Sequence, residues 1–300
     1  MRIQKHKLPC CICGAYEPET LYRDELNDTA PAVEYNFTPD TRKTYAIAKC
    51  RQCGHIYTDP MPLLDDVYQD SEDEVYSQHR EQREKCFRKL AHPLWREFPS
   101  GDLLDIGCAT GILLDVMAER YRTFGVEPSA WSRTQCAPRH HVAASLDAFA
   151  GQTFDIITLL GVIEHLYTPQ TLIADISKML RPGGLFLVYT GDVDAWLPRL
   201  LRKKWWWYQG MHLHYFSKKN LSRLLGLHGL RTIRTLNMPL YFKVESLSKS
   251  LSRYETLHRL VHPILSLPVI NNLMVPMPIS GELLLVARKE ASTSRTCSQG

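Results

Sequence analysis

The stretch Leu103-Leu104-Asp105-Ile106-Gly107-Cys108-Ala109-Thr110-Gly111-Ile112-Leu113-Leu114 decides how this chain folds. It opens with a short, mostly apolar run, which is typical of a strand buried in a parallel sheet. Two glycines follow, and a residue without a Cβ permits a tight turn and a close approach of the backbone to a ligand. A helical pattern then begins, so the first backbone N–H groups of the helix face the same ligand position. The stretch therefore predicts the first βα turn of a nucleotide-binding unit.

Three later segments extend this prediction. The apolar run 123–126 ends in Glu127, about 20 residues after Asp105, where an acid can bind both hydroxyls of a ribose. The run 154–160 leads into Gly161-Val162-Ile163-Glu164-His165-Leu166, and Leu180-Arg181-Pro182-Gly183-Gly184 opens another apolar run. Because ligands of parallel sheets bind at the carboxyl ends of strands, residues at these ends are expected to share one site.

In order and spacing, these segments resemble the motif series of class I S-adenosylmethionine-dependent methyltransferases, over residues from about 100 to 190. The resemblance implies an α/β fold with a Rossmann-like, seven-stranded sheet, and S-adenosylmethionine as the cofactor. Ala109 stands at the middle position of the family's Gly-x-Gly-x-Gly, which alters the fine shape of the loop. Asp147 falls where the family contacts the adenine. The implied cofactor-binding residues are Asp105, Gly107, Ala109, Gly111, Glu127, Asp147, Leu160 and Gly161.

Alternating strand and helix patterns support a parallel sheet that is covered on both faces. The expected strands are 102–106, 122–127, 141–144, 154–160, 184–190, 229–234 and 282–288. The expected helices are 78–98, 111–120, 129–137, 169–180 and 218–228, the last capped by Ser217. By resemblance, the seventh strand is the antiparallel edge strand of the fold. Tyr68 and Tyr76, near the first helix, are candidates for a lid over the cofactor or for plain packing.

A cysteine-rich module precedes the sheet. Cys10-Cys11-Ile12-Cys13-Gly14 and Cys50-Arg51-Gln52-Cys53-Gly54 repeat one spacing, in which both sulfurs of a knuckle can face one ion. We expect a structural Zn²⁺ bound by four thiolates, because four protein ligands leave no position for water. Similar zinc knuckles precede the catalytic domain of some sugar C-methyltransferases. The expected ligands are Cys10, Cys13, Cys50 and Cys53, with Cys11 pointing away.

These patterns divide the chain into a zinc-binding module (1–60), a linker with a covering helix (61–99), a methyltransferase domain (100–290) with a helical insert (about 240–278), and a disordered tail (291–300). The net charge of +4 is too small to indicate a nucleic-acid partner. The sequence shows neither an export signal nor a run of 18 apolar residues, and its nine cysteines fit metal binding in a reducing compartment. We therefore expect a cytoplasmic location.

Two segments suggest contact with the inner face of a membrane or with a lipid-linked substrate. Residues 199–207 combine four cations with three tryptophans, and both kinds of side chain favour the lipid interface. Residues 243–262 form a basic amphipathic helical pattern, for which packing within the domain or in a dimer is the alternative. The sequence makes no prediction of oligomeric state.

Two histidines are candidates for a catalytic base, since the pKa of histidine lies near neutrality. His212, the first candidate, begins His212-Leu213-His214-Tyr215-Phe216-Ser217, which resembles a His-x-x-x-Phe-Ser signature of methyltransferases acting on sugars, quinones and other small molecules. Its alternative role is to bond to the backbone and hold the loop. His165 follows the fourth strand, where shaping the pocket is its alternative role. Tyr208 and His214 are weaker candidates on the substrate side.

The prediction is a methyltransferase acting on carbon or oxygen of a small-molecule or glycan-type biosynthetic intermediate. One alternative is an RNA methyltransferase whose zinc module grips the nucleic acid. Leu159-Leu160-Gly161 lacks the Pro-Pro-aromatic turn that holds a base amine, and the module is not visibly basic, so nucleic acid is disfavoured. The other alternative is a module that binds S-adenosylmethionine without catalysis.

Overall fold

The computed structural model describes residues 3–31, 42–64, 74–238, 241–244, 273–276 and 281–290, together with 259, 263, 265, 267 and 270. Tyr68, the predicted tail and most of the 243–262 pattern lie outside the described residues. Two short strands border the insert: β13 (Tyr241–Lys243) pairs antiparallel with β14 (Met274–Pro276).

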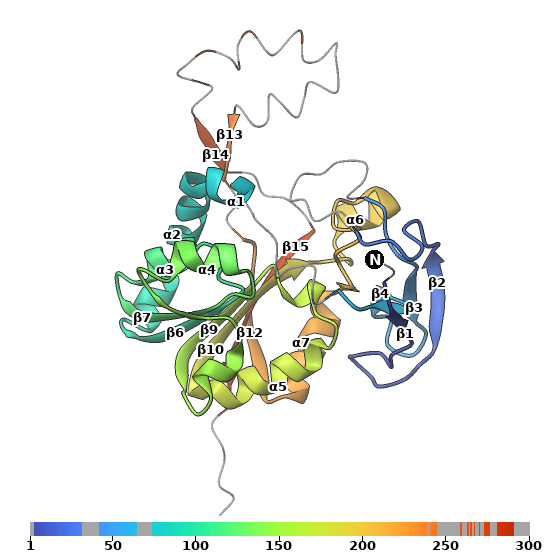
Figure 1. The fold of residues 1–300 in the computed structure, drawn as a ribbon, viewed down its shortest axis with the longest axis horizontal. Helices are drawn as coiled ribbons and strands as arrows, with labels where there is room; N and C mark the ends of the chain where they lie inside the picture. The colour runs from blue at the N-terminus through green and yellow to red at the C-terminus, as the bar shows by residue number, and fades with distance from the viewer. Residues whose placement is uncertain are drawn as a thin grey trace, which may run out of the picture.

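A seven-stranded sheet forms the centre of the molecule, in the order β12-β15-β10-β9-β6-β7-β8 (Figure 1). The pairs β8–β7, β7–β6, β6–β9 and β9–β10 are parallel, whereas β15 is antiparallel to both of its neighbours. This arrangement confirms the predicted α/β fold. The strands are β6 (Gly101–Ile106), β7 (Tyr121–Val126), β8 (His141–Ala143), β9 (Phe154–Leu160), β10 (Leu180–Gly191), β12 (Leu230–Leu236) and β15 (Glu282–Lys289).

The predicted place of the last strand was wrong. β15 is antiparallel as expected, but it lies between β10 and β12 and is not an edge strand. The reason is its composition: the run 283–287 is apolar and buried throughout, which suits a strand with neighbours on both sides. β12 carries Arg231 and Arg234 and is mostly exposed, and charged side chains are typical of edge strands.

Helices cover both faces of the sheet. Successive side chains of a strand point to opposite faces, so Leu103 packs in the cluster that includes α2 and α3, while Leu104 packs in the cluster that includes α5 and α7. Ser129 and Ser217 cap α4 and α7 through hydrogen bonds from the backbone N–H groups of Ser132 and Asn220. The helices are α1 (Glu74–Gln78), α2 (Arg80–Glu97), α3 (Ile112–Met117), α4 (Ala130–Cys136), α5 (Pro169–Met179), α6 (Trp196–Leu201) and α7 (Lys218–Leu227).

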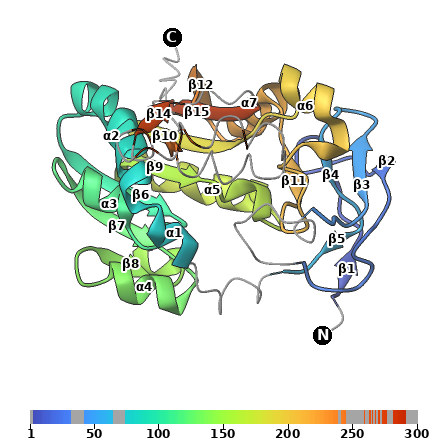
Figure 2. The same ribbon diagram turned by 90° about the horizontal axis from the view of Figure 1, so that it is seen from above.

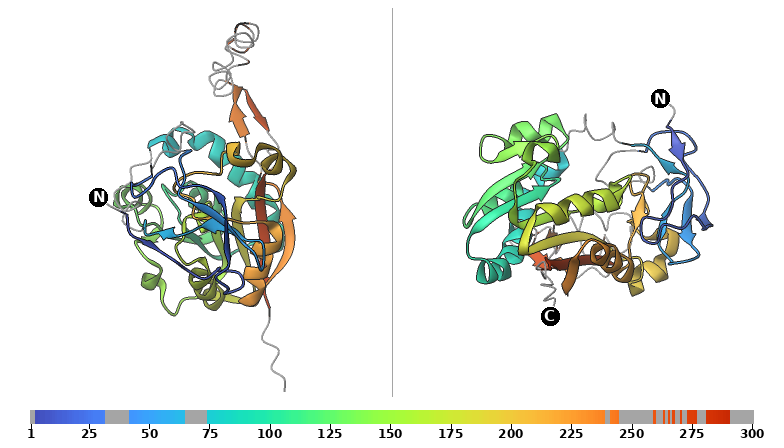
Figure 3. Two further views of the ribbon diagram at one scale, coloured as in Figure 1. Left: turned by 90° about the vertical axis from the view of Figure 1, so that its right-hand side faces the viewer. Right: turned by 90° about the horizontal axis from the view of Figure 1, so that it is seen from below.

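The N-terminal module lies at the far end of the molecule from α4 and beside α6 (Figures 2 and 3). Its four-stranded sheet has the order β11-β4-β3-β2, and β11 (His214–Tyr215) comes from the segment that connects β10 to β12 of the large sheet. The module is therefore completed by a distant segment. Its other strands are β1 (Lys5–His6), β2 (Pro18–Tyr22), β3 (Ile47–Cys50), β4 (Ile56–Thr58) and β5 (Met61–Pro62), with β1 paired to β5.

The tryptophans of 199–207 pack at the junction between the module and the large sheet. Trp205 is 1% exposed and Trp207 is 9% exposed, in a cluster with Ile47 of β3 and with Tyr215 of β11. Two of the three indoles are therefore buried at this junction and do not face a lipid surface. Within the described residues, no helix has the length and apolar character needed to span a membrane.

Candidate cofactor and substrate site

A cavity of about 410 Å³ opens where β6, β7 and β9 end. The turn after β6, the end of β7 and the segment after β9 form its walls, and Tyr76 of α1 is among the lining residues. The lining residues include Tyr76, Gly107, Ala109, Glu127, Ser132, Leu160, Gly161, Val162, His165 and Tyr167. Five of the eight predicted cofactor-binding residues therefore meet at one cavity.

Gly107 and Gly111 of the βα turn lack room for a Cβ for different structural reasons. Gly107 lines the cavity at φ +79°, and a Cβ there would lie 2.4 Å from Cγ2 of Val162. Gly111, at φ +81°, is not among the lining residues: its Cβ would lie 2.5 Å from Sγ of Cys136, so it permits α3 to pack against α4. Ala109 adopts φ +46°, a left-handed conformation that costs a residue with a Cβ about 1–2 kcal/mol.

Glu127 joins the turn to the end of β7. Its carboxylate accepts hydrogen bonds from the backbone N–H of Ala109 at 2.9 Å and of Ser129 at 2.8 Å. A carboxylate offers about four acceptor positions, so it can hold the loop and accept ligand hydroxyl groups together. Glu127 thus sets the shape of the loop as well as the polarity of the cavity wall.

Asp105 and Asp147 lie away from the cavity lining. Asp105 is 4% exposed, and its Oδ1 accepts a hydrogen bond from Thr158 Oγ1 at 2.6 Å. Burial, together with the nearby negative charge of Glu127, raises the pKa of Asp105 to about 7. Asp147 is exposed in a 3₁₀ turn (Leu146–Phe149). Sequence reasoning missed Thr158, because a threonine within an apolar strand gives no sign of its partner.

Two histidines and a glutamate converge beside the cavity. The His165 and His212 rings meet edge to face with centroids 4.7 Å apart. One ring nitrogen of each histidine and one carboxylate oxygen of Glu164 lie within 4.8 Å of one another. His165 lines the cavity, whereas His212 is 7% exposed and is not among the lining residues. The sequence predicted both histidines at the site, and the structure places His165, not His212, on the cavity wall.

The ring tautomers of both histidines follow from their hydrogen bonds. Nδ1 of His165 lies 3.1 Å from the Met211 carbonyl oxygen, and Nδ1 of His212 lies 2.7 Å from that of Trp207. A carbonyl only accepts, so each ring carries its proton on Nδ1, and Nε2 is the basic nitrogen. Burial lowers the pKa of His165 to about 4 and that of His212 well below its usual value, so both rings are neutral at pH 7.

Glu164 is uncharged as well. Its side chain is 1% exposed and Oε2 accepts a hydrogen bond from Thr190 Oγ1 at 3.0 Å. Burial raises the pKa of Glu164 to about 8. The weaker substrate-side candidates lie elsewhere: Tyr208 packs against Tyr215, with ring centroids 4.7 Å apart, and His214 contacts the N-terminal module.

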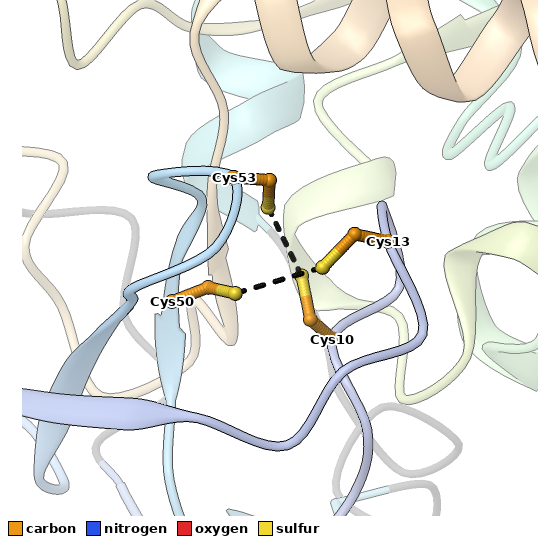
Figure 4. A group of neighbouring side chains, drawn as sticks. All are labelled: Cys10, Cys13, Cys50 and Cys53. Atoms are coloured by element: carbon orange, nitrogen blue, oxygen red, sulfur yellow. Dashed lines mark hydrogen bonds between the residues drawn. The ribbon is translucent and has the colours of Figure 1, made fainter.

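The four predicted cysteine ligands converge from two loops (Figure 4). Sγ of Cys10 lies 3.5 Å from that of Cys53, and Sγ of Cys13 lies 3.6 Å from that of Cys50. A tetrahedral ion with Zn–S bonds of about 2.3 Å places sulfurs about 3.8 Å apart, so the set fits zinc. The knuckles share one conformation, since Gly14 and Gly54 both have φ +76° and each donates to the carbonyl of the first cysteine at 2.8 Å.

Comparisons with known proteins found chains that are similar to this one. "Ubiquinone biosynthesis O-methyltransferase" of Parvibaculum lavamentivorans is 33% identical over 106 residues, 32% of this chain and 42% of that protein. The Brucella anthropi protein of the same name is 27% identical over 183 residues, 52% of this chain and 70% of that protein. The match thus spans less than half of the first relative. Magnesium protoporphyrin IX methyltransferase of Synechocystis, solved with SAH, is 12% identical, with a TM-score of 0.49 and coverage of 75% of this chain and 92% of that one.

One family comparison covers the larger part of the chain. Residues 78–235 match the family described as "Methyltransferase domain". The matched region begins just before α2 and ends in β12, and it includes every residue of the cavity except Tyr76. The chain therefore belongs to the methyltransferase domain family.

Proposed function

We propose that this protein transfers a methyl group from S-adenosylmethionine to a small-molecule biosynthetic intermediate. The cavity carries the proposal, because a glycine turn, an acid at the next strand end and a histidine line one space. When bound, the cofactor supplies a methyl group that is activated on a sulfonium. The residues that would hold it are the 107–109 turn, Glu127 for ribose hydroxyls, and Leu160–Gly161.

We assign the base to His165. It lines the cavity and its basic nitrogen is Nε2, so it is placed to take the proton of an acceptor hydroxyl. His212 acts as a positioning residue, since its ring packs edge to face on His165. Val162 and Tyr167 supply walls that exclude water and align the acceptor.

The acceptor class proposed is a hydroxyl-bearing or C–H-acidic intermediate such as a sugar, a glycan or a quinone precursor. The names of the relatives support oxygen as the acceptor, and the zinc knuckles with the His-x-x-x-Phe-Ser segment support a sugar. A lipid-linked acceptor is supported by α6, where Trp196 is 67% exposed and Leu200 is 70% exposed. We also propose that Cys10, Cys13, Cys50 and Cys53 hold a structural Zn²⁺.

The test combines labelled S-adenosylmethionine with nucleotide sugars, lipid-linked glycans and catechol-type quinone precursors, followed by mass spectrometry. A methylated product is expected, and His165→Gln should lower turnover about 100-fold or more while cofactor affinity by calorimetry is unchanged. His92→Gln, at an exposed histidine of α2, is the matched control. Cofactor binding without any product would favour a non-catalytic module. Salt-dependent filter binding to RNA would favour the nucleic-acid alternative.

A further inference from the structure

Beside the four-cysteine site lies a second cluster of metal-binding side chains. Cys11 comes from the first knuckle, His55 follows the second knuckle, and His214 lies on β11. Nδ1 of His214 is 3.1 Å from Nε2 of His55 and 3.7 Å from Sγ of Cys11. All three atoms lie within 4.8 Å of one another, and none of them belongs to the four-cysteine set.

The distances fit a tetrahedral ion. Zn–N bonds of about 2.0–2.1 Å and Zn–S bonds of about 2.3 Å place two nitrogens about 3.3 Å apart and a nitrogen and a sulfur about 3.6 Å apart. The observed separations are 3.1 Å and 3.7 Å. One thiolate and two imidazoles are also donors that zinc-class ions prefer.

Hydrogen bonding alone does not satisfy this cluster. Both contacts meet at Nδ1 of His214, and a ring nitrogen carries either one proton or one lone pair. Whichever of His55 and Cys11 it bonds, the other is left with a contact to His214 that it cannot use as a hydrogen bond. His55 is 0% exposed and His214 is 3% exposed, so water does not compensate from the surface. An ion at the centre engages all three atoms at once.

We propose that Cys11, His55 and His214 bind a second zinc-class divalent ion, which fastens the N-terminal module to the segment beside the candidate active site. β11 pairs with β4, and the backbone N–H of Leu213 donates to the Glu164 carbonyl oxygen at 2.7 Å. The ion thus fixes a strand that touches both the module and the turn carrying His165. Three protein ligands leave one position of a tetrahedral ion for water or another ligand.

Metal content of the full chain tests the proposal. Protein produced with zinc and passed over a chelating resin should contain two Zn per chain by mass spectrometry. Cys11→Ser and His214→Ala should each contain one, and Cys50→Ser should lose the other ion. His92→Ala, on the exposed face of α2, should retain both. Cys11→Ser guards against misfolding, since it changes one atom of a partly exposed side chain.

Cobalt substitution gives an independent readout. Co²⁺-loaded wild-type protein should show thiolate-to-cobalt absorption from two sites, and Cys11→Ser should lose the weaker, one-thiolate part while the four-thiolate part persists. One Zn per chain in the wild type, or two in both Cys11→Ser and His214→Ala, would overturn the proposal. Since metal counting needs no substrate, its failure would leave the methyl-transfer proposal untouched.

Discussion

Replacing Glu164 by glutamine should make the protein more stable, and the gain should grow with pH. The carboxyl group is buried, and its pKa is raised from 4.5 to about 8. Multiplying that rise by about 1.4 kcal/mol per pH unit gives roughly 5 kcal/mol for ionising Glu164 inside the folded protein. Glutamine cannot ionise, and its carbonyl can still accept the hydrogen bond from Thr190 Oγ1.

The sign follows from proton binding. Between pH 4.5 and about 8 the folded state keeps a proton on Glu164 that the unfolded state has lost, so wild-type stability falls as pH rises through this window. Below pH 4.5 the group contributes no such loss. The difference between Glu164→Gln and wild type should therefore increase from pH 5 and level off above about pH 8.

Urea unfolding followed by tryptophan fluorescence at pH 5, 6, 7, 8 and 9 measures this difference directly. Other titrating groups act equally in both proteins and cancel. Glu17→Gln, at an exposed position, is the matched control and should track the wild type at every pH. A Glu164→Gln difference that stays constant within about 1 kcal/mol from pH 5 to 9 would refute the reasoning.

Three further changes test the cofactor turn and the junction with the module. Glu127→Ala should weaken S-adenosylmethionine binding by about 1–3 kcal/mol in calorimetry, the scale of a charged hydrogen bond, and an unchanged affinity would remove it from the site. Ala109→Gly should stabilise the fold by about 0.5–1 kcal/mol in urea, since it relieves a left-handed φ; a loss would mean that the methyl group packs favourably. Gly191→Ala should cost about 1–3 kcal/mol, because its Cβ would lie 2.7 Å from Trp207 and 2.8 Å from Trp205; a neutral effect would show that the indoles shift freely.

The order of the large sheet was predictable in part. Continuous apolar runs such as 103–106 and 154–160 identify buried parallel strands, because both faces of such strands are covered by helices. The resemblance to a family gave β15 the correct direction but the wrong place. The sequence alone does not give the order of the strands, because that order depends on which distant strands pair. The exposed arginines of β12 could, however, have indicated that β12 is the edge strand.

The sequence by itself determined the features that are built from residues close together in the chain. The C-x-x-C-G spacing alone brings two sulfurs of a knuckle together, and the glycine turn after β6 follows from backbone freedom within a few residues. Only the tertiary structure decided contacts between distant segments. It placed His165 on the cavity wall with His212 behind it, buried Trp205 under β3, and brought His214 to Cys11 across 203 positions. Spacing along a chain fixes short-range geometry, whereas packing of the whole core decides which distant side chains meet.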